Sequence, residues 1–331
     1  MSGSTNCHEP TRMNSVPDSC RFVQIYGFFP PCLRASVVIL LLLTGLARAE
    51  APATQPATLP TSYKLEKFER STPKLQGWVA RIDLTDPKLQ IAVGTGGPDP
   101  DGAGMWETIL APTSTIAKAN NFDLAINTVF FMNKKPDDKE GGLKYQSGDF
   151  AASCGLVMTG GKMLALRRDG VPILFDKQNR ASIGSLNVIP QGANVIVSGN
   201  QQIVFRGQPV AKLDTAERHP RTAIGIADQG KTLVLLVIDG RREAWSVGMS
   251  SQELAVAMIE LGCQSALNLD GGGSSTMVVR KPTPQGDAWK VINTPSDGST
   301  FPLPLSIERS VPYVLGFRWV ANETSATQPV P

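Results

Sequence analysis

The segment Ala266–Val279, with the sequence ALNLDGGGSSTMVV, places an aspartate and three glycines between two apolar runs. The runs Ala266–Leu269 and Thr276–Val279 are short and rich in aliphatic residues, and we predict that both are strands. Three consecutive glycines cost conformational entropy, so they are expected where the backbone takes a positive φ or where another group approaches closely. Asp270 is therefore predicted to lie at the end of a strand, directly before an unusual turn.

The turn itself is a candidate binding site, and its residues are Gly271, Gly272, Gly273, Ser274 and Ser275. Successive backbone N–H groups in such a turn can form a concavity for an anion, which the two serine hydroxyls could extend. An ordinary hairpin turn is the alternative, although it normally needs only one or two glycines. The turn is not a Walker loop, because the lysine and the following helix are missing.

Two other predicted strand ends carry charged residues. Asp239 closes the apolar run LVLLVID, and Arg221 opens the run RTAIGI. If these strands lie beside the one that ends at Asp270, two carboxylates and a guanidinium meet at one sheet edge. We predict Asp239 and Asp270 as catalytic residues and Arg221 as an anion ligand, because the planar guanidinium matches phosphate or carboxylate geometry. A turn-forming aspartate and a surface ion pair are the alternatives.

Three more polar residues are candidates. Asn127 lies within LAINTVFF (Leu124–Phe131), which is predicted to be one buried strand. A buried amide needs a hydrogen-bond partner, so Asn127 either holds the protein together or holds a substrate hydroxyl. Glu308 and Arg309 precede the apolar segment VPYVLGF and are interpreted as a structural ion pair that could support the site.

The remaining pattern indicates an α+β fold. The region from Gly77 to Gly94 is predicted to be a hairpin or meander, and Arg221–Ala227 and Lys231–Asp239 to be a strand pair. Ser250 and Glu253 form a capping box for a helix that stops at Gly262. Because strands outnumber helices and connect by short turns, we predict a single domain over 63–320. It would be built on a mixed, largely antiparallel sheet with a few packed helices.

The amino-terminal residues predict export. Arg34 precedes a largely apolar stretch of 13 residues, Ala35–Ala47, and Ala47-Arg48-Ala49 is a small-x-small cleavage pattern. These features are typical of a secretory signal peptide over 1–49, so we expect a secreted or periplasmic protein. No run approaches the ~20 apolar residues of a membrane span, and none is expected after cleavage. Residues 50–62 are interpreted as a Pro/Ala/Thr-rich linker and residues 321–331 as a disordered tail.

The composition excludes several classes of function. The 331 residues include 32 basic and 29 acidic side chains, without charged blocks, so no nucleic-acid partner is expected. Two histidines exclude a multi-histidine metal site. The sequence requires no cofactor, although aspartate and carbonyl oxygens would suit Ca²⁺ or Mg²⁺. Cys154 and Cys263, the cysteines after the cleavage point, could pair or stay free. The sequence predicts no oligomeric state.

Several of these segments together resemble the phosphodiester glycosidase family. The segments are HPRTAIGI (219–226), VIDGR (237–241), QELAVAMIELGC (252–263) and ALNLDGGGSSTMVV, with AINTVFF before them and INTPSDG and ERSVPYVLGF after them. The resemblance covers roughly Lys64 to Arg318, which is nearly all of the expected mature chain.

The resemblance implies hydrolysis of a sugar-1-phosphodiester, or of a related glycosidic bond, outside the cytoplasm. The family's motif positions fall on Asn127, Arg221, Asp239, Asp270, Gly271 to Ser275, Glu308 and Arg309. Relatives often carry glycine after the asparagine of the first motif, whereas this chain has Thr128 and Val129. The expected substrate is a sugar phosphate or a cell-envelope glycan. A phosphodiesterase that breaks the P–O bond and a non-catalytic glycopolymer-binding protein are the alternatives.

Overall fold

The computed structural model describes residues 63–136, 145–184, 188–297 and 307–320. The expected signal peptide (1–49), linker (50–62) and tail (321–331) lie outside the described residues. Within these described ranges, neither helix has the length and apolar character that crossing a membrane requires.

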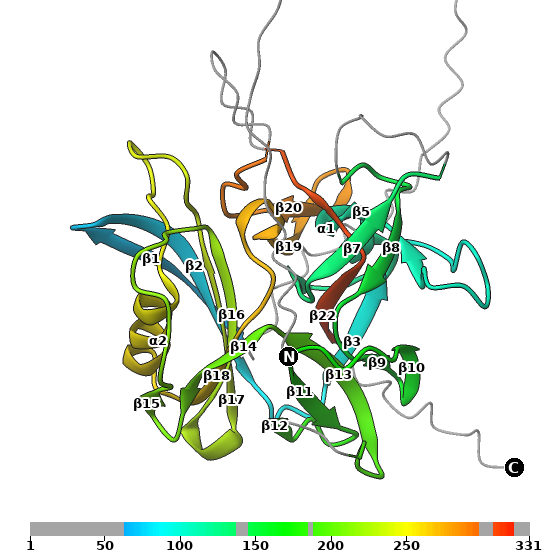
Figure 1. The fold of residues 1–331 in the computed structure, drawn as a ribbon, viewed down its shortest axis with the longest axis horizontal. Helices are drawn as coiled ribbons and strands as arrows, with labels where there is room; N and C mark the ends of the chain where they lie inside the picture. The colour runs from blue at the N-terminus through cyan, green and yellow to red at the C-terminus, as the bar shows by residue number, and fades with distance from the viewer. Residues whose placement is uncertain (1–62, 137–144, 185–187, 298–306, 321–331) are drawn as a thin grey trace, which may run out of the picture. The chain divides into compact units, whose positions relative to one another are not determined.

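A seven-stranded sheet carries most of the candidate site (Figure 1). Helix α2 (Ser251–Glu260) lies against one face of this sheet. The strands, in their order across the sheet, are β1 (Tyr63–Ser71), β2 (Lys74–Asp83), β17 (Thr232–Ile238), β16 (Arg221–Ala227), β18 (Cys263–Asn268), β14 (Gln201–Phe205) and β15 (Gln208–Pro209).

Two five-stranded sheets and helix α1 (Thr113–Ala119) complete most of the fold. One sheet has the order β20 (Gly286–Val291), β19 (Met277–Thr283), β6 (Leu124–Asn127), β22 (Tyr313–Trp319) and β3 (Leu89–Thr95). The other has the order β10 (Lys162–Ala165), β9 (Val157–Thr159), β13 (Ala193–Gly199), β11 (Val171–Asp176) and β12 (Ala181–Ile183). The short strands are β4 (Thr108–Ile109), β8 (Phe150–Ser153) and β7 (Phe131–Lys134) in one sheet, and β21 (Ser310–Val311) with β5 (Ala111–Pro112) in another.

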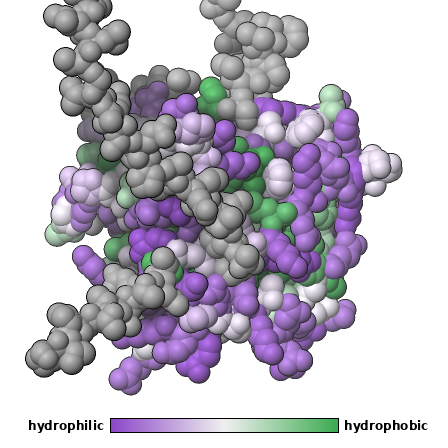
Figure 2. Space-filling view, turned by 180° about the vertical axis from the view of Figure 1, so that it is seen from behind, coloured by the Kyte–Doolittle hydropathy of each residue, from purple (hydrophilic) through white to green (hydrophobic). Residues whose placement is uncertain are grey.

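Alternating side chains divide the interior into layers. On β17, Leu235 and Val237 face the main core between the sheets, whereas Leu236 and Ile238 face α2. Strand β22 alternates in the same way, since Leu315 joins the main core and Val314 packs toward α1. The order of layers is therefore α2, the seven-stranded sheet, the sheet that contains β22, and α1. Among the described residues visible in Figure 2, hydrophilic residues predominate, and hydrophobic residues reach the surface near the centre.

The predicted α+β class is confirmed, and so is the helix after Ser250. The Ser250 hydroxyl accepts from the backbone N–H of Glu253, the Glu253 carboxylate accepts from that of Ser250, and α2 ends before Gly262, whose φ is +92°. The strand pair β16–β17 is also confirmed. Every pairing between the described strands is antiparallel, and the strands form several sheets rather than the single sheet expected.

Two strand predictions are wrong. The region from Gly77 to Gly94 is no hairpin, because β2 and β3 belong to different sheets whose apolar side chains meet in the main core. The run Leu124–Phe131 is not one strand either. Strand β6 ends at Asn127, and β7 begins at Phe131 in another sheet. The chain leaves β6 here because the carbonyl of Thr128 accepts from the backbone N–H of Asp270, at 2.8 Å, instead of continuing the ladder.

Candidate active site

Three strand ends meet at one edge of the seven-stranded sheet. Strand β16 lies between β17 and β18, with Arg221 opposite Ile238 and Ala223 opposite Asn268. Asp239 and Asp270, which follow β17 and β18, therefore leave the sheet on either side of the start of β16. The backbone N–H of Gly272 donates to the carbonyl of Pro220 at 2.8 Å, so the glycine turn folds back over that start.

The three glycines are needed because other groups approach them closely. A Cβ on Gly271 would lie 2.8 Å from the carbonyl oxygen of Pro220, and one on Gly273 would lie 1.9 Å from Oδ1 of Asp297. Gly272 has a φ of +59°, and a Cβ there would lie 3.1 Å from a guanidinium nitrogen of Arg241. The turn is thus packed against a backbone carbonyl, an arginine and an ion pair.

Four of the five N–H groups of the turn, those of Gly271, Gly272, Ser274 and Ser275, have acceptors within the protein. That of Gly271 donates to the Asp270 carboxylate at 2.9 Å, and that of Ser274 donates to the carbonyl of Gly271 at 3.1 Å. Together with the bond donated by Gly272, these contacts occupy the N–H groups that an anion-binding concavity would offer to a ligand. The turn therefore differs from the concavity that the three glycines predicted. Cationic side chains around the turn are the better candidates for holding a phosphate charge. The hydroxyls of Ser275 and Thr276 are buried and have no partner among the described residues.

Asn127 connects the two ends of the turn. Its amide nitrogen donates to the carbonyl of Asp270 at 2.6 Å, and its amide oxygen accepts from the hydroxyl of Thr222 at 2.8 Å and the N–H of Thr276 at 3.1 Å. The side chain is fully buried. Both polar atoms of Asn127 are thus occupied by the protein, so the residue positions Asp270.

Asp270 is the half-buried carboxylate of the site. Burial raises its pKa to about 6, although the nearby Ser274 hydroxyl and the positive charge of Arg309 lower it in part. An acid with a pKa close to neutrality can exchange protons efficiently during a reaction near neutral pH. Asp270 therefore combines accessibility with a pKa suited to catalysis.

Arg309 supplies a fixed positive charge beside Asp270. Its guanidinium donates to both carboxylate oxygens of Asp297, at 2.8 and 3.0 Å, and lies 4.1 Å from the centre of the Tyr145 ring. Burial alone would lower the pKa of Arg309, but the Asp297 carboxylate raises it above its usual value. Glu308 bonds elsewhere, since it accepts from the N–H and hydroxyl of Ser114 in α1. The two adjacent residues therefore have different partners.

Asp239 is enclosed by donors. The indole of Trp245 donates to Oδ2 at 2.8 Å, and Oδ1 accepts from the amide of Asn293 at 3.1 Å and the N–H of Thr294 at 2.8 Å. Only 3% of Asp239 is exposed, and burial raises its pKa. The Asn293 amide also donates to the carbonyl of Ser275 at 2.9 Å, which connects Asp239 to the end of the glycine turn. These contacts suit a positioning residue better than a reacting one.

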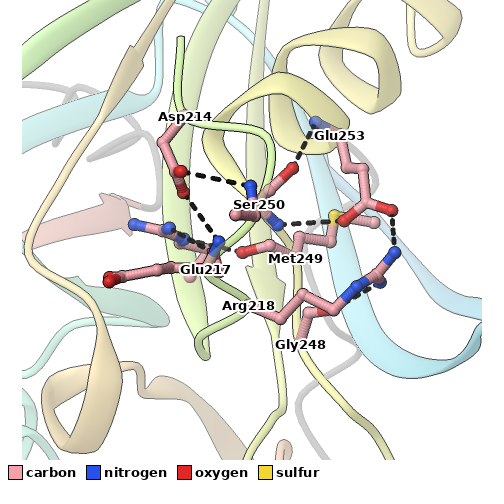
Figure 3. A network of polar contacts seen from close by, with 9 residues as sticks. Asp214, Glu217, Arg218, Gly248, Met249, Ser250 and Glu253 are labelled. Carbon is pink, nitrogen blue, oxygen red and sulfur yellow. Dashed lines mark hydrogen bonds and ion pairs between the residues drawn. The ribbon is translucent and has the colours of Figure 1, made fainter.

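Arg221 turns toward the segment before α2. Its Nε donates to the carbonyl of Met249 at 2.9 Å, and an Nη donates to the carbonyl of Glu217 at 3.3 Å. Burial lowers its pKa, and the charges of Asp214 and Glu217 offset that effect in part. Figure 3 shows this region, in which Arg218 also pairs with the capping residue Glu253. Arg221 thus ties the start of β16 to α2.

Sequence reasoning missed Trp245, Asn293, Asp297 and Tyr145. Asn293 and Asp297 lie in INTPSDG, a segment that matched the family pattern, so their position was a usable signal. Tyr145 gave no comparable signal, because its role depends on Arg309, far along the chain. Trp245 gave none either, although its partner Asp239 is only six residues away. Cys154 and Cys263 are both free thiols. Within the described ranges, we find no group of three or more His, Cys, Asp or Glu residues placed to hold a metal ion.

A solved structure shares this architecture. The catalytic domain of zebrafish N-acetylglucosamine-1-phosphodiester alpha-N-acetylglucosaminidase, in a form auto-inhibited by its pro-peptide, superposes with a TM-score of 0.55 at 18% identity. The superposition covers 79% of this chain and 86% of that one, and at this identity it shows the fold alone. A hypothetical protein from Synechocystis is 16% identical with a TM-score of 0.46, over 82% of this chain and 64% of that one.

Sequence comparisons give the family. The SPbeta prophage-derived uncharacterized protein YomE of Bacillus subtilis (strain 168) is 34% identical over 113 residues, which are 34% of this chain and only 15% of that relative. The family model for phosphodiester glycosidases matches residues 120–318. Because this match spans more than half of the chain, the protein belongs to the phosphodiester glycosidase family.

Proposed function

We propose that the protein hydrolyses the bond between the anomeric carbon and the phosphate oxygen of a sugar-1-phosphodiester. The observation that carries the proposal is Asp270, a half-buried carboxylate with a pKa of about 6 beside the fixed charge of Arg309. The leaving phosphate monoester is stable, so it needs little help from a general acid. What the reaction does need is a carboxylate near the anomeric carbon and positive charge near the phosphate.

In the proposed reaction, the ionised Asp270 faces the anomeric carbon. It either attacks that carbon or takes a proton from the attacking water, and in both cases it stabilises the oxocarbenium-like transition state. The C1–O bond breaks, and its electron pair stays on the phosphate oxygen. Water supplies the new hydroxyl at C1. We assign the phosphate charge to Arg309 and to Arg241, whose guanidinium packs on Gly272.

We assign Asp239 and Asn127 to positioning. Both carboxylate oxygens of Asp239 accept bonds from the protein, and Asn127 uses both amide atoms to hold the turn. Substituting either residue is expected to lower kcat/KM by displacing the glycine turn. Asp270 is the only one of the two predicted aspartates that we retain as a catalytic residue.

Hydrolysis in ¹⁸O-labelled water tests the bond that breaks. The purified protein is incubated with the methyl diester of a sugar 1-phosphate, and the released phosphate ester is examined by ³¹P NMR. The proposal predicts a phosphate product without ¹⁸O, because water attacks carbon. Label in the phosphate would instead establish a phosphodiesterase. Binding of the diester without any turnover would establish the non-catalytic alternative.

We also propose that the protein is exported. The support is the pattern of Arg34, the apolar Ala35–Ala47 and the Ala47-Arg48-Ala49 cleavage pattern. Expression of the whole chain in a bacterial cell should yield a periplasmic or secreted form that begins at Glu50. Intact mass measurement checks this, and an uncleaved cytoplasmic product would refute the export proposal.

A further inference from the structure

A cavity of about 130 Å³ is lined by residues at the ends of strands β8, β11 and β13. The residues that line it include Phe130, Cys154, Asp169, Ser198 and Asn200. They combine one aromatic surface with a thiol, a carboxylate, a hydroxyl and an amide. A sugar ring presents the same mixture of apolar C–H faces and hydroxyl groups.

Backbone contacts connect this cavity to Asp270 on two sides. On one side, the N–H of Cys154 donates to the carbonyl of Phe130 at 2.8 Å, and the neighbouring Thr128 accepts from Asp270. On the other side, the N–H of Asn200 donates to the carbonyl of Asn268 at 3.1 Å, two residues before Asp270. The cavity is therefore held between the two chain segments that adjoin the catalytic carboxylate.

Side-chain contacts and charge agree with that placement. The amide of Asn268 donates to the amide oxygen of Asn200 at 2.8 Å, while the amide oxygen of Asn268 is buried without a partner among the described residues. Burial raises the pKa of the Cys154 thiol, and the negative charge of Asp270 raises it further. Asp270 thus lies within electrostatic reach of a thiol that lines the cavity.

A larger groove lies far from the candidate active site. It has a volume of about 530 Å³, and Lys231 and Thr232 line it at the start of β17. Asp239 follows the other end of that seven-residue strand, so the groove lies about 20 Å from the site along the strand.

We propose that the smaller cavity receives the sugar ring of the substrate, with Cys154 in contact with it, so that residue 154 helps to select the sugar. This inference rests on the proposed function, and it names the subsite that the proposed reaction needs beside Asp270. The volume is well below the roughly 300–1,000 Å³ of common small-molecule pockets, which suits one ring rather than an extended glycan.

Thiol labelling of the unsubstituted protein provides the first test. At pH 8, the Cys154 thiolate attacks the sulfur of methyl methanethiosulfonate, an S–S bond forms and methanesulfinate leaves. Cys263 is the internal control, because it is buried and its pKa is raised to about 12. We expect peptide mass spectrometry to find the label on Cys154, and kcat/KM for the sugar diester to fall at least tenfold. Glucose 1-phosphate or N-acetylglucosamine 1-phosphate should protect both the thiol and the activity.

Variants provide the second test. Cys154→Ala enlarges the cavity, so the ratio of kcat/KM between N-acetylglucosaminyl and glucosyl diesters should change several-fold. Cys263→Ala removes a thiol from the core under α2 and should leave that ratio unchanged. If Cys154→Ala does not fold, the labelling of the unsubstituted protein still decides the question.

The two proposals fail in different ways. Turnover of a diester, with an unchanged sugar ratio in Cys154→Ala or with labelling that saturating sugar phosphates do not slow, would overturn the subsite alone. The absence of turnover on every sugar-1-phosphodiester would overturn the proposed function and the subsite with it.

Discussion

At the scale of single residues, the two predicted aspartates differ in their surroundings. Asp239 accepts from Trp245, Asn293 and Thr294, whereas the bond that Asp270 accepts at its carboxylate comes from the adjacent Gly271. A carboxylate that is saturated by the protein is held still, while one with free lone pairs can reach a substrate. We therefore propose two different roles for the same residue type, because its environment differs.

Replacing Trp245 by phenylalanine tests the positioning role of Asp239. The change removes the indole donor from a buried carboxylate, so the free energy of unfolding should fall by about 1–3 kcal/mol. Because Asp239 holds Asn293, and Asn293 holds the glycine turn, kcat/KM should also fall about 10- to 100-fold. Thermal unfolding and steady-state kinetics measure the two effects.

Trp289→Phe is the matched control. It also removes an indole bond, here to the carbonyl of Phe122 at 2.7 Å, but β20 lies outside the site. It should lower stability without lowering kcat/KM. Equal activity losses in the two variants would argue against the positioning role.

The sequence predicted the positions of some site residues correctly and missed the contacts of others. Asp270 and the glycines could be found because a strand, an acidic residue and a glycine run are adjacent in the chain. The orientation of the Arg221 side chain could not be predicted from the sequence, because its guanidinium donates to the carbonyl of Met249, which is 28 residues away. Asn293, a partner of Asp239, was missed for the same reason, since it is 54 residues away.

At the scale of elements, the sequence predicted secondary structure correctly where that structure depends on residues close together in the chain. The capping box of Ser250 and Glu253 and the strand pair β16–β17 depend on short separations, and the structure has both. The hairpin prediction for β2 and β3 failed because apolar alternation shows that a strand is half-buried but does not say in which sheet it lies. Residues 84–88 carry the chain from one sheet to the next.

Gly272→Ala tests the glycine turn as an element. The φ of +59° is strained for alanine, so we expect a loss of stability of roughly 1–2 kcal/mol. The new methyl group would also displace Arg241, which lies 3.1 Å from its position, and kcat/KM should fall. Gly207→Ala is the control, because its φ is +73° and a methyl group there would have no other atom within 4 Å. Equal losses of stability in the two variants, with no loss of activity in either, would contradict this role of the turn.

Ser250→Ala tests the cap of α2. It removes the hydroxyl that accepts from the N–H of Glu253 at 3.2 Å, and the cost should be about 1 kcal/mol. The effect is measured as a shift in the midpoint of urea unfolding. Ser182→Ala, in an exposed position of β12, should leave the midpoint unchanged. Equal midpoints for the two variants would refute the contribution of the cap.

At the scale of the whole molecule, Asp270 should make stability depend on pH. Its pKa is about 6 in the fold and about 3.9 in an unfolded chain, so the folded state binds the proton more tightly. The free energy of unfolding should therefore fall as pH rises from about 4 to 6 and level off above. The fall is at most about 3 kcal/mol, and less where water reaches the half-buried side chain.

Asp270→Asn should lose this part of the pH dependence, so it should be more stable than the unsubstituted protein at pH 7. Asp176→Asn should behave in the opposite way, because the Arg180 side chain and backbone donors lower the pKa of Asp176 despite the opposing effect of burial. Urea unfolding at a series of pH values measures both. A stability difference for Asp270→Asn that does not vary between pH 4 and 7 would contradict the raised pKa.

The most direct test of the catalytic role of Asp270 is the pH dependence of kcat/KM for a sugar-1-phosphodiester, measured from pH 4 to 8. If the ionised Asp270 performs the reaction, kcat/KM rises through an apparent pKa near 6 and then stays level. Asp270→Asn should lose about 10²- to 10⁴-fold and show no such rise. An Asp270→Asn protein that keeps most of the activity, or keeps the same rise near pH 6, would contradict it.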